Sequence, residues 1–458
     1  MISDHPPAAA SASQITEGRL ARRVGLFDAV MVVMGGIIGS GIFINPYVVA
    51  QRVHTPFLIV AAWAAGGAIA LLGAFIYAEL AAQRPHVGGQ YAYLREAYHP
   101  ALGFLYGWVL LLVIQTGGMA AVTVTFARYF LDLTGLAVSQ GTVALSALLI
   151  LTIINCMGVR LGSRVQSLFM LLKIAAIAAL ILCGFWFIRE PQTMGRPFLD
   201  RAPSFGLLTA FGSAMVPVLF AYGGWQTANF IAAEVKEPRQ NLSRALLIGV
   251  SGVILLYLGV NIVCVRALGP VKLAGTQVPA TEVMMLALGP WGARLIALGI
   301  AISTLGFLSQ SVLTAPRVYF AMAEDRLFFR SVGYVSARTR VPTVAIIVQS
   351  VWTAVIAFSR SYEKILSYVV AMDFLFFGLT ATTIFVFRRR ERKDSGEAYG
   401  YRMPGHPWTT ALFIATCWLV VLNTIYTEPK NSLLGMGILL LGLPVYLLWE
   451  WLGKARQS

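Results

Sequence analysis

A short glycine-rich segment near the start of the chain can bind charged groups through its backbone. Residues Met34–Phe43 have the sequence MGGIIGSGIF and lie inside an apolar run from Leu26 to Ala50. Because each glycine in a helix interior costs about 0.5–1 kcal/mol relative to alanine, the segment predicts a helix interrupted at mid-length. The N–H groups that begin the new half-helix attract an anion, and the carbonyl groups that end the old one accept from a cation.

Long apolar runs surround this segment and must position it. The chain of 458 residues is 58% hydrophobic and 12% charged, whereas about 25% of the residues in a soluble protein are charged. A run of ~20 apolar residues crosses a bilayer as a helix. We therefore predict an all-α polytopic membrane protein with twelve transmembrane helices. The runs are Leu26–Ala50, Phe57–Leu80, Ala101–Tyr129, Gly141–Met157, Val165–Ile188, Phe205–Ala233, Leu242–Val265, Ala293–Met322, Val341–Phe358, Ile365–Phe387, Trp408–Thr427 and Leu433–Trp451.

The distribution of lysine and arginine predicts the orientation. With the N-terminus inside, the inside segments hold roughly twice as many of these residues as the outside ones. We expect an inner (plasma) membrane protein with both termini cytoplasmic. Residues 1–24 are expected to form a disordered cytoplasmic tail before an uncleaved first helix. Basic inside loops meet anionic lipid, which explains the net charge of +15 without nucleic-acid binding.

The sixth apolar run contains a second paired-glycine segment. Residues Phe220–Gln226 have the sequence FAYGGWQ, and the first and sixth runs each begin a group of five. Unwound backbone at membrane depth must line a polar cavity or hold a ligand, because each unsatisfied group costs several kcal/mol in lipid. Small residues also allow close packing between membrane helices, and for the first segment alone this explanation is as good as a binding site. Matched interruptions in two halves favour a transporter built from inverted repeats.

The expected ligand has an anionic group and a cationic group close together. A carboxylate would bind at the start of the new half-helix, and an ammonium would bind the freed carbonyls of both breaks. An α-amino acid carries both groups. The expected N–H donors are Ser40, Gly41 and Ile42, and the expected carbonyl acceptors are Ile37, Ile38, Phe220, Ala221 and Gly223.

Four segments together resemble the amino acid–polyamine–organocation superfamily, and within it the L-type amino acid transporter branch and its bacterial members. The resemblance implies a LeuT-like core of two inverted five-helix repeats, at 25–190 and 203–390, in which the first and sixth helices are discontinuous. It also implies a cytoplasmic loop at 391–407, two peripheral helices at 408–452 and a cytoplasmic tail at 453–458. The segments are GGIIGSGIFINP (35–46), YAELAAQRPHVGGQYAYLREAYHPALGFLYGW (77–108), FAYGGWQTANFIAAEVKEPRQNLSRA (220–245) and APRVYFAMAEDRLF (315–328).

The resemblance also implies roles for individual residues. The substrate backbone would be held by Ile37, Ser40 and Gly41 of the first helix and by matching residues of the sixth. The Phe220 ring would act as a gate, and Gly223 would leave room for a side chain. The cavity wall or gate would include Tyr222, Trp225, Gln226 and Ser303, although packing alone explains Trp225 equally well.

Lys173 is a lysine deep inside an apolar run. It follows Arg164 by nine residues, which places it ~14 Å into the membrane at 1.5 Å per residue. It can be a structural lysine that reaches a helix-end carbonyl. The resemblance implies instead that its ammonium replaces a bound sodium ion, with carbonyls near Met34–Gly36 and a hydroxyl of Ser303 or Thr304 as partners. Proton coupling through Lys173 remains open.

Asp373 is an acidic residue in the tenth run. It can be a buried hydrogen-bonded strut, a gate or a contact for a cation, and the first of these is favoured. Neither glycine segment contains an acidic residue, although a dicationic polyamine would need one. The sequence therefore argues against a polyamine as the substrate, and the side-chain room at Gly223 favours neutral amino acids, including large ones.

We predict a secondary active transporter of neutral L-amino acids, a sodium-independent exchanger or facilitator that works by alternating access. A proton-coupled symporter of the same fold and a non-transporting amino acid sensor are the alternatives. No arrangement of residues suggests catalysis, so no enzyme, cofactor or metal site is expected. The four cysteines all fall in apolar runs, so no outside cysteine is expected to attach an obligate partner subunit.

Overall fold

The computed structural model describes residues 20, 22–188, 198–199, 204–358, 362–394, 400–427 and 429–455. The regular elements in these ranges are helices, and none is a β-strand. Most of the expected N-terminal tail, part of the expected 391–407 loop and the last three residues lie outside the described residues. The all-helical architecture agrees with the predicted fold class.

The first half of the chain begins with a broken helix. Its two parts, α2 (Leu26–Ile37) and α3 (Gly41–Arg52), are followed by α4 (Pro56–Gln83), a long uninterrupted helix. The third apolar run forms one continuous rod of three elements that includes a short π-helix. The remaining elements of this half are α5 (Gln90–Ala97), α6 (Pro100–Val109), η1 (Leu110–Ile114), α7 (Gln115–Thr134), α8 (Gln140–Cys156) and α9 (Val159–Phe187).

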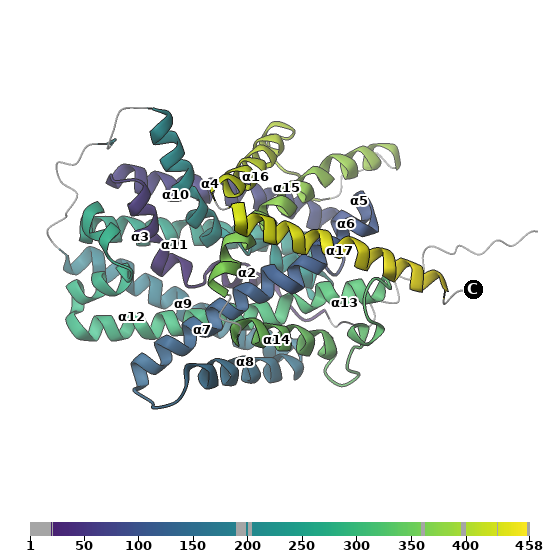
Figure 1. Ribbon diagram of the computed structural model, residues 1–458, viewed down its shortest axis with the longest axis horizontal. Helices are drawn as coiled ribbons and strands as arrows, with labels where there is room; N and C mark the ends of the chain where they lie inside the picture. The colour runs from purple at the N-terminus through teal and green to yellow at the C-terminus, as the bar shows by residue number, and fades with distance from the viewer. Residues whose placement is uncertain are drawn as a thin grey trace, which may run out of the picture.

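The second half also begins with a broken helix. Its parts are α10 (Phe205–Tyr222) and the 3₁₀-helix η2 (Trp225–Glu234), and the long α11 (Pro238–Gly275) follows. The last two helices, α16 and α17, pack mainly on α15 and α6 (Figure 1). The other elements are α12 (Pro279–Thr314), α13 (Pro316–Glu324), η3 (Arg330–Gly333), α14 (Thr343–Phe358), α15 (Tyr362–Asp394), α16 (Trp408–Thr427) and α17 (Pro429–Ala455).

Ten helical segments of the described chain are long and apolar enough to cross a membrane. The helices α8 and α14 are apolar but shorter, and they coincide with the fourth and ninth predicted runs. Local signals set several helix boundaries. The Thr55 hydroxyl accepts from the N–H of Leu58 at the start of α4, and Ser204 caps α10 in the same way. The left-handed Gly135 ends α7.

Helices from the two halves pack in pairs around the two broken helices. In particular, α4 packs on α11, α7 on α12, and α8 on α14. The broken helices meet as well, since α2 contacts η2 and α3 contacts α10. The helix α2 accordingly lies in the middle of the bundle in Figure 1.

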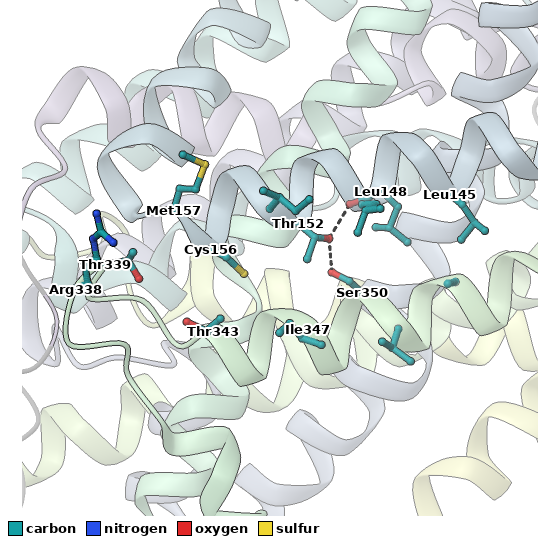
Figure 2. A pocket seen from close by; sticks show the side chains of 14 residues that line it. Leu145, Leu148, Thr152, Cys156, Met157, Arg338, Thr339, Thr343, Ile347 and Ser350 are labelled. Atoms are coloured by element: carbon teal, nitrogen blue, oxygen red, sulfur yellow. Dashed lines mark hydrogen bonds between the residues drawn. The ribbon is translucent and has the colours of Figure 1, made fainter.

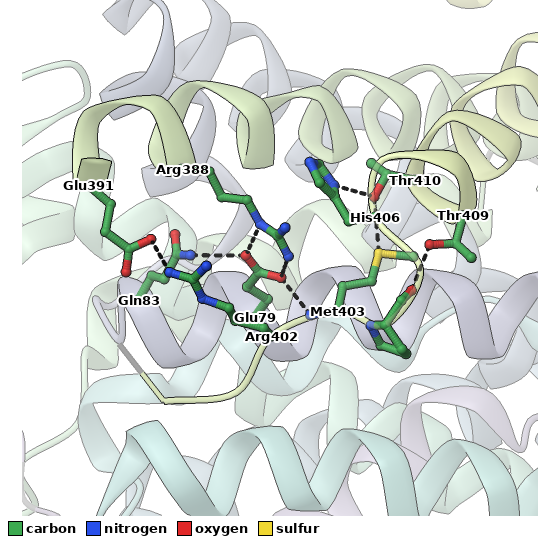
Figure 3. A network of polar contacts seen from close by, with 10 residues as sticks. Glu79, Gln83, Arg388, Glu391, Arg402, Met403, His406, Thr409 and Thr410 are labelled. Atoms are coloured by element: carbon green, nitrogen blue, oxygen red, sulfur yellow. Dashed lines mark hydrogen bonds and ion pairs between the residues drawn. The ribbon is translucent and has the colours of Figure 1, made fainter. Parts of the chain in front are cut away.

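A buried carboxylate fastens one end of this bundle (Figure 3). Glu79 of α4 is completely buried and accepts from Nε and Nη2 of Arg388 at 2.6 and 2.7 Å. It also accepts from the backbone N–H of Met403 at 2.6 Å and from Gln83 at 3.0 Å. Because the four donors satisfy the carboxylate, the charge ties α4 to α15 and to the segment before α16.

Candidate functional site

The first helix is interrupted where the glycine-rich sequence predicts. The last residue of α2 is Ile37, and Ile38 adopts an extended conformation with φ −76° and ψ 97°. The helix α3 begins three residues later, at Gly41. The break therefore leaves carbonyl groups at the end of α2 and N–H groups at the start of α3, both in the protein interior.

Lys173 of α9 donates to the freed carbonyls of this break. Its Nζ atom lies 2.5 Å from the Ile38 oxygen and 3.4 Å from the Gly35 oxygen, and the side chain is completely buried. Gly306 of α12 leaves room for the ammonium, which would lie 3.1 Å from a Cβ atom at that position. One cation thus lies where α2, α9 and α12 meet.

The expected hydroxyl partners of Lys173 have other acceptors. Ser303 donates to the Gly39 oxygen at 3.0 Å. Thr304 donates to the Ile300 and Ala301 oxygens of its own helix. The described hydrogen bonds of Lys173 go to backbone carbonyls, and a hydroxyl that donates elsewhere can still accept a hydrogen bond, so the expected bond from Lys173 to Ser303 or Thr304 stays a prediction.

The second helix is interrupted at its paired glycines. The helix α10 ends at Tyr222, Gly223 is extended, and Gly224 has a φ of 102°. The chain continues as the 3₁₀-helix η2. Only glycine adopts this φ without strain, so Gly224 is the residue that turns the chain.

The two breaks touch each other through glycine backbone. A Cβ atom on Gly224 would overlap the carbonyl of Gly36, and one on Gly36 would lie 2.6 Å from the Gly224 oxygen. Thr227 donates to that oxygen at 2.7 Å, and Gln310 of α12 donates to the Thr227 hydroxyl at 2.6 Å. The crossing is therefore held by polar groups from a third helix.

Tyr257 of α11 connects the breaks at a second point. Its hydroxyl lies 3.1 Å from the Ile37 oxygen and 3.2 Å from the Ala221 oxygen. A phenol carries one proton and so donates to one of these carbonyls at a time. Of the five carbonyls expected to bind an ammonium, Ile38 thus accepts from Lys173, Phe220 accepts from the Gly223 N–H at 3.1 Å, and Ile37 and Ala221 share the one proton of Tyr257.

A cavity of about 120 Å³ lies between the two breaks and the helices α7, α12 and α15. That volume accommodates several water molecules or a small organic ligand. The expected residues that line it are Ile37, Ser40, Gly41, Phe220, Ala221, Gly223, Gln226 and Asp373. Phe220, the expected gate, is also 36% exposed.

The other expected residues lie behind the cavity wall. Ile38 and Ile42 are completely buried and do not line the cavity, because their side chains pack in the core. Tyr222 packs against Trp63 and Tyr257, and Trp225 stacks on Phe377. The residues behind the wall are Ile38, Ile42, Lys173, Tyr222, Trp225, Ser303 and Thr304.

Sequence reasoning missed several cavity residues on the intact helices. Gln115 of α7 follows directly after the π-helix η1, a local irregularity that occurs frequently at functional sites. Phe307 and Gln310 of α12 also line the cavity. Gln115 and Gln310 are polar residues inside apolar runs, and this was the signal that could have identified them.

The C-terminal end of η2 is held by a buried ion pair and by backbone pairing. Glu234 at the end of η2 accepts from Nε and Nη2 of Arg317 at 2.7 and 3.2 Å, and both side chains are completely buried. The backbone of Val24 pairs with that of Val235. Lys236 donates its backbone N–H to the Val24 oxygen at 2.9 Å. These contacts fix the end of η2 against the segment that precedes α2.

A larger cavity, of about 900 Å³, lies between α8 and α14 (Figure 2). Its lining is apolar apart from the Thr152–Ser350 hydrogen bond and the residues at the Arg338 end. Many lining side chains are exposed on the outside of the bundle, including Leu149 at 60% and Val351 at 59%. Because the groove faces away from both breaks and offers few polar groups, we do not assign it to a polar ligand.

Comparison with known proteins agrees with this arrangement. The family model described as "Amino acid permease" matches residues 24–447. The serine/threonine exchanger SteT of Bacillus subtilis is 31% identical over 432 residues, which cover 93% of this chain and 96% of the relative. The large neutral amino acids transporter small subunit 2 of Rattus norvegicus is 30% identical over 460 residues, which cover 97% of this chain and 84% of the relative.

A third relative extends the comparison to another kind of transporter. The b(0,+)-type amino acid transporter 1 of Mus musculus is 30% identical over 384 residues, which cover 82% of this chain and 77% of the relative. These relatives are transporters and not enzymes, and they support amino acid transport as the activity. The chain is an integral multi-pass membrane protein that belongs to the amino acid permease family of the amino acid–polyamine–organocation superfamily.

Proposed function

We propose that this protein is a secondary active transporter that exchanges neutral L-amino acids across the inner membrane by alternating access, without sodium. The observation that carries the proposal is the cavity between two broken helices whose backbones cross at Gly36 and Gly224. Such a site presents N–H groups from Ser40 and Gly41 beside carbonyl groups from the second break. A substrate with adjacent carboxylate and ammonium groups complements this backbone.

The proposed architecture has twelve spans, ten of which form two inverted five-helix repeats. The pairwise packing of α4 on α11, α7 on α12 and α8 on α14 supports a pseudo-two-fold relation between the halves. The short helices α8 and α14 would count as the fourth and ninth spans. With both termini in the cytoplasm, the Glu234–Arg317 pair would close the cytoplasmic side and leave the cavity to open outward.

The position of Lys173 supports transport without sodium. The resemblance places a sodium ion of sodium-coupled relatives between the first, fifth and eighth spans. In this chain the Lys173 ammonium lies between α2, α9 and α12 and donates to the Gly35 and Ile38 carbonyls. A fixed positive charge at that place repels a cation and satisfies the carbonyls that would otherwise bind it.

We also propose that the chain works without an obligate partner subunit. All four cysteines lie within helices, namely α8, α9, α11 and α16, and all are free. A disulfide to a partner in an outside loop would need a cysteine there, and the sequence has none.

Counterflow in purified proteoliposomes tests the proposed function. Vesicles are loaded with an unlabelled neutral amino acid, and uptake of a labelled one is followed in sodium-free buffer at two pH values. The proposal predicts uptake that requires internal amino acid and ignores sodium. Uptake into empty vesicles that grows with an inward proton gradient would identify a proton symporter instead. Binding without any flux would identify a sensor.

A further inference from the structure

Among the described residues, one ionisable side chain lines the cavity. Val369, Val370, Asp373, Phe374 and Phe377 of α15 all line it, and their spacing of about one helical turn places them on one face. Asp373 is therefore on the cavity face of α15. The favoured prediction of a buried hydrogen-bonded strut stays a prediction, because the described residues give Asp373 no hydrogen bond to a neighbouring helix.

The Asp373 carboxylate has no cationic partner in the described structure. None of the described residues that line the cavity is lysine, arginine or histidine. Lys173 is directed to the carbonyls at the end of α2. Within the described residues, no hydrogen bond or ion pair to Asp373 occurs. An acidic side chain at membrane depth is costly unless it is paired or faces a polar cavity, so its presence here indicates a functional contact.

The surroundings of Asp373 are those of a side-chain subsite. The backbone N–H and carbonyl groups that suit the α-carboxylate and α-ammonium of a substrate belong to the two breaks. The wall formed by α15 offers only Val369, Val370 and aromatic rings besides Asp373. A substrate held by its backbone at the breaks would direct its side chain to the intact helices, where an apolar stem packs on these residues.

We propose that Asp373 binds the cationic end of a substrate side chain, so that the transporter accepts basic amino acids such as lysine and arginine in addition to neutral ones. This inference rests on the proposed function and widens its substrate class. The polar side chains of Gln115 and Gln310 in the same cavity supply further acceptors for a guanidinium or ammonium. The glycine segments contain no acidic residue, and in this proposal the carboxylate comes from α15 instead.

The test is competition in the counterflow assay. The assay measures how strongly unlabelled lysine, arginine or leucine inhibits the exchange of a labelled neutral amino acid, in wild type and in Asp373→Asn. We expect the ratio of the half-inhibitory concentrations, lysine over leucine, to rise roughly ten- to a hundredfold in Asp373→Asn, as for loss of one hydrogen-bonded charge pair. Asp132→Asn, an exposed acid at the end of α7, should leave the ratio unchanged.

Several outcomes would overturn the inference. If Asp373→Asn weakens lysine and leucine equally, Asp373 binds the α-ammonium common to all amino acids. If wild type exchanges neutral amino acids but neither lysine nor arginine competes, basic side chains are not substrates. If the ratio is unchanged and only a pH dependence of uptake is lost, Asp373 carries a proton. Failure of exchange with every amino acid would instead refute the proposed function, so the two failures are distinguishable.

Discussion

Replacing Gly224 by alanine should disable the crossing of the two broken helices. Gly224 has a φ of 102°, and a residue with a Cβ atom costs about 1–2 kcal/mol in a left-handed conformation. The new Cβ atom would also overlap the Gly36 carbonyl. Overpacking of this kind costs about 1–3 kcal/mol, so the two effects together reach about 2–5 kcal/mol.

This energy translates into a large loss of transport. Each 1.4 kcal/mol changes a population about tenfold, so the state with crossed breaks should fall by at least roughly thirtyfold. The assay is the initial rate of counterflow per amount of protein in the vesicles. Gly212→Ala is the matched control, because Gly212 lies in α10, the helix that ends just before the second break, and its Cβ atom would meet no atom within 4 Å.

Two results would refute this reasoning. One is an exchange rate for Gly224→Ala within about twofold of wild type, since the breaks would then not need to touch at this glycine. The other is an equal loss of rate in Gly212→Ala, since the effect would then come from any added methyl group in this span and not from the crossing. Gly36→Ala approaches the same contact from the other side, with its Cβ atom 2.6 Å from the Gly224 oxygen. It should show a similar loss.

Three further predictions concern the charges around the cavity. Lys173→Ala should lower the exchange rate at least tenfold without changing the amount of protein in the membrane, because it removes a charged donor from two buried carbonyls. A wild-type exchange rate in this variant would contradict the proposed role of Lys173. Lys272→Ala is the control, because the Lys272 side chain is 53% exposed. Replacing sodium by a large organic cation should leave wild-type exchange within about twofold, and a steep sodium dependence would contradict the proposed role of Lys173. Glu234→Gln breaks a completely buried ion pair, a change that costs about 3–5 kcal/mol. It should therefore increase the rate at which a thiol reagent added on the cytoplasmic side labels a cysteine introduced by Ala228→Cys, a completely buried position of η2. Equal labelling with and without the Glu234→Gln change would show that the pair does not hold the cytoplasmic side closed, and the exposed Arg402→Gln serves as its control.

The sequence predicted the elements whose local chemistry is strong. Paired glycines mark both interruptions: the second helix breaks at Gly223–Gly224, and the first breaks just after Gly35–Gly36, at residues 38–40, because glycine weakens a helix wherever it lies. The positions of the twelve runs were also predictable, since hydrophobic length alone specifies a membrane helix. All twelve fall on helices, although α8 and α14 are shorter than a typical span.

The sequence could not predict contacts that depend on the rotation of one helix against another. Gln310 bonds to Thr227 because of the way α12 faces η2, and Tyr257 reaches both breaks because of the way α11 packs on them. The bond from Ser303 to the Gly39 oxygen depends on the same rotation. Asp373 faces the cavity for this reason too, and no local pattern in the tenth run distinguishes a cavity face from a packed one.

The most direct test of the account is whether an amino acid occupies the cavity between the two breaks. Ala121 of α7 lines that cavity, and Ala121→Cys in a variant whose four native cysteines are replaced offers one thiol there. Leu136→Cys, at a position just after α7 where the native side chain is 54% exposed, is the control. We predict that a transported amino acid slows thiol labelling of Ala121→Cys several-fold and leaves Leu136→Cys unaffected. Unchanged labelling of Ala121→Cys at a concentration that saturates exchange would place the substrate elsewhere and contradict the account.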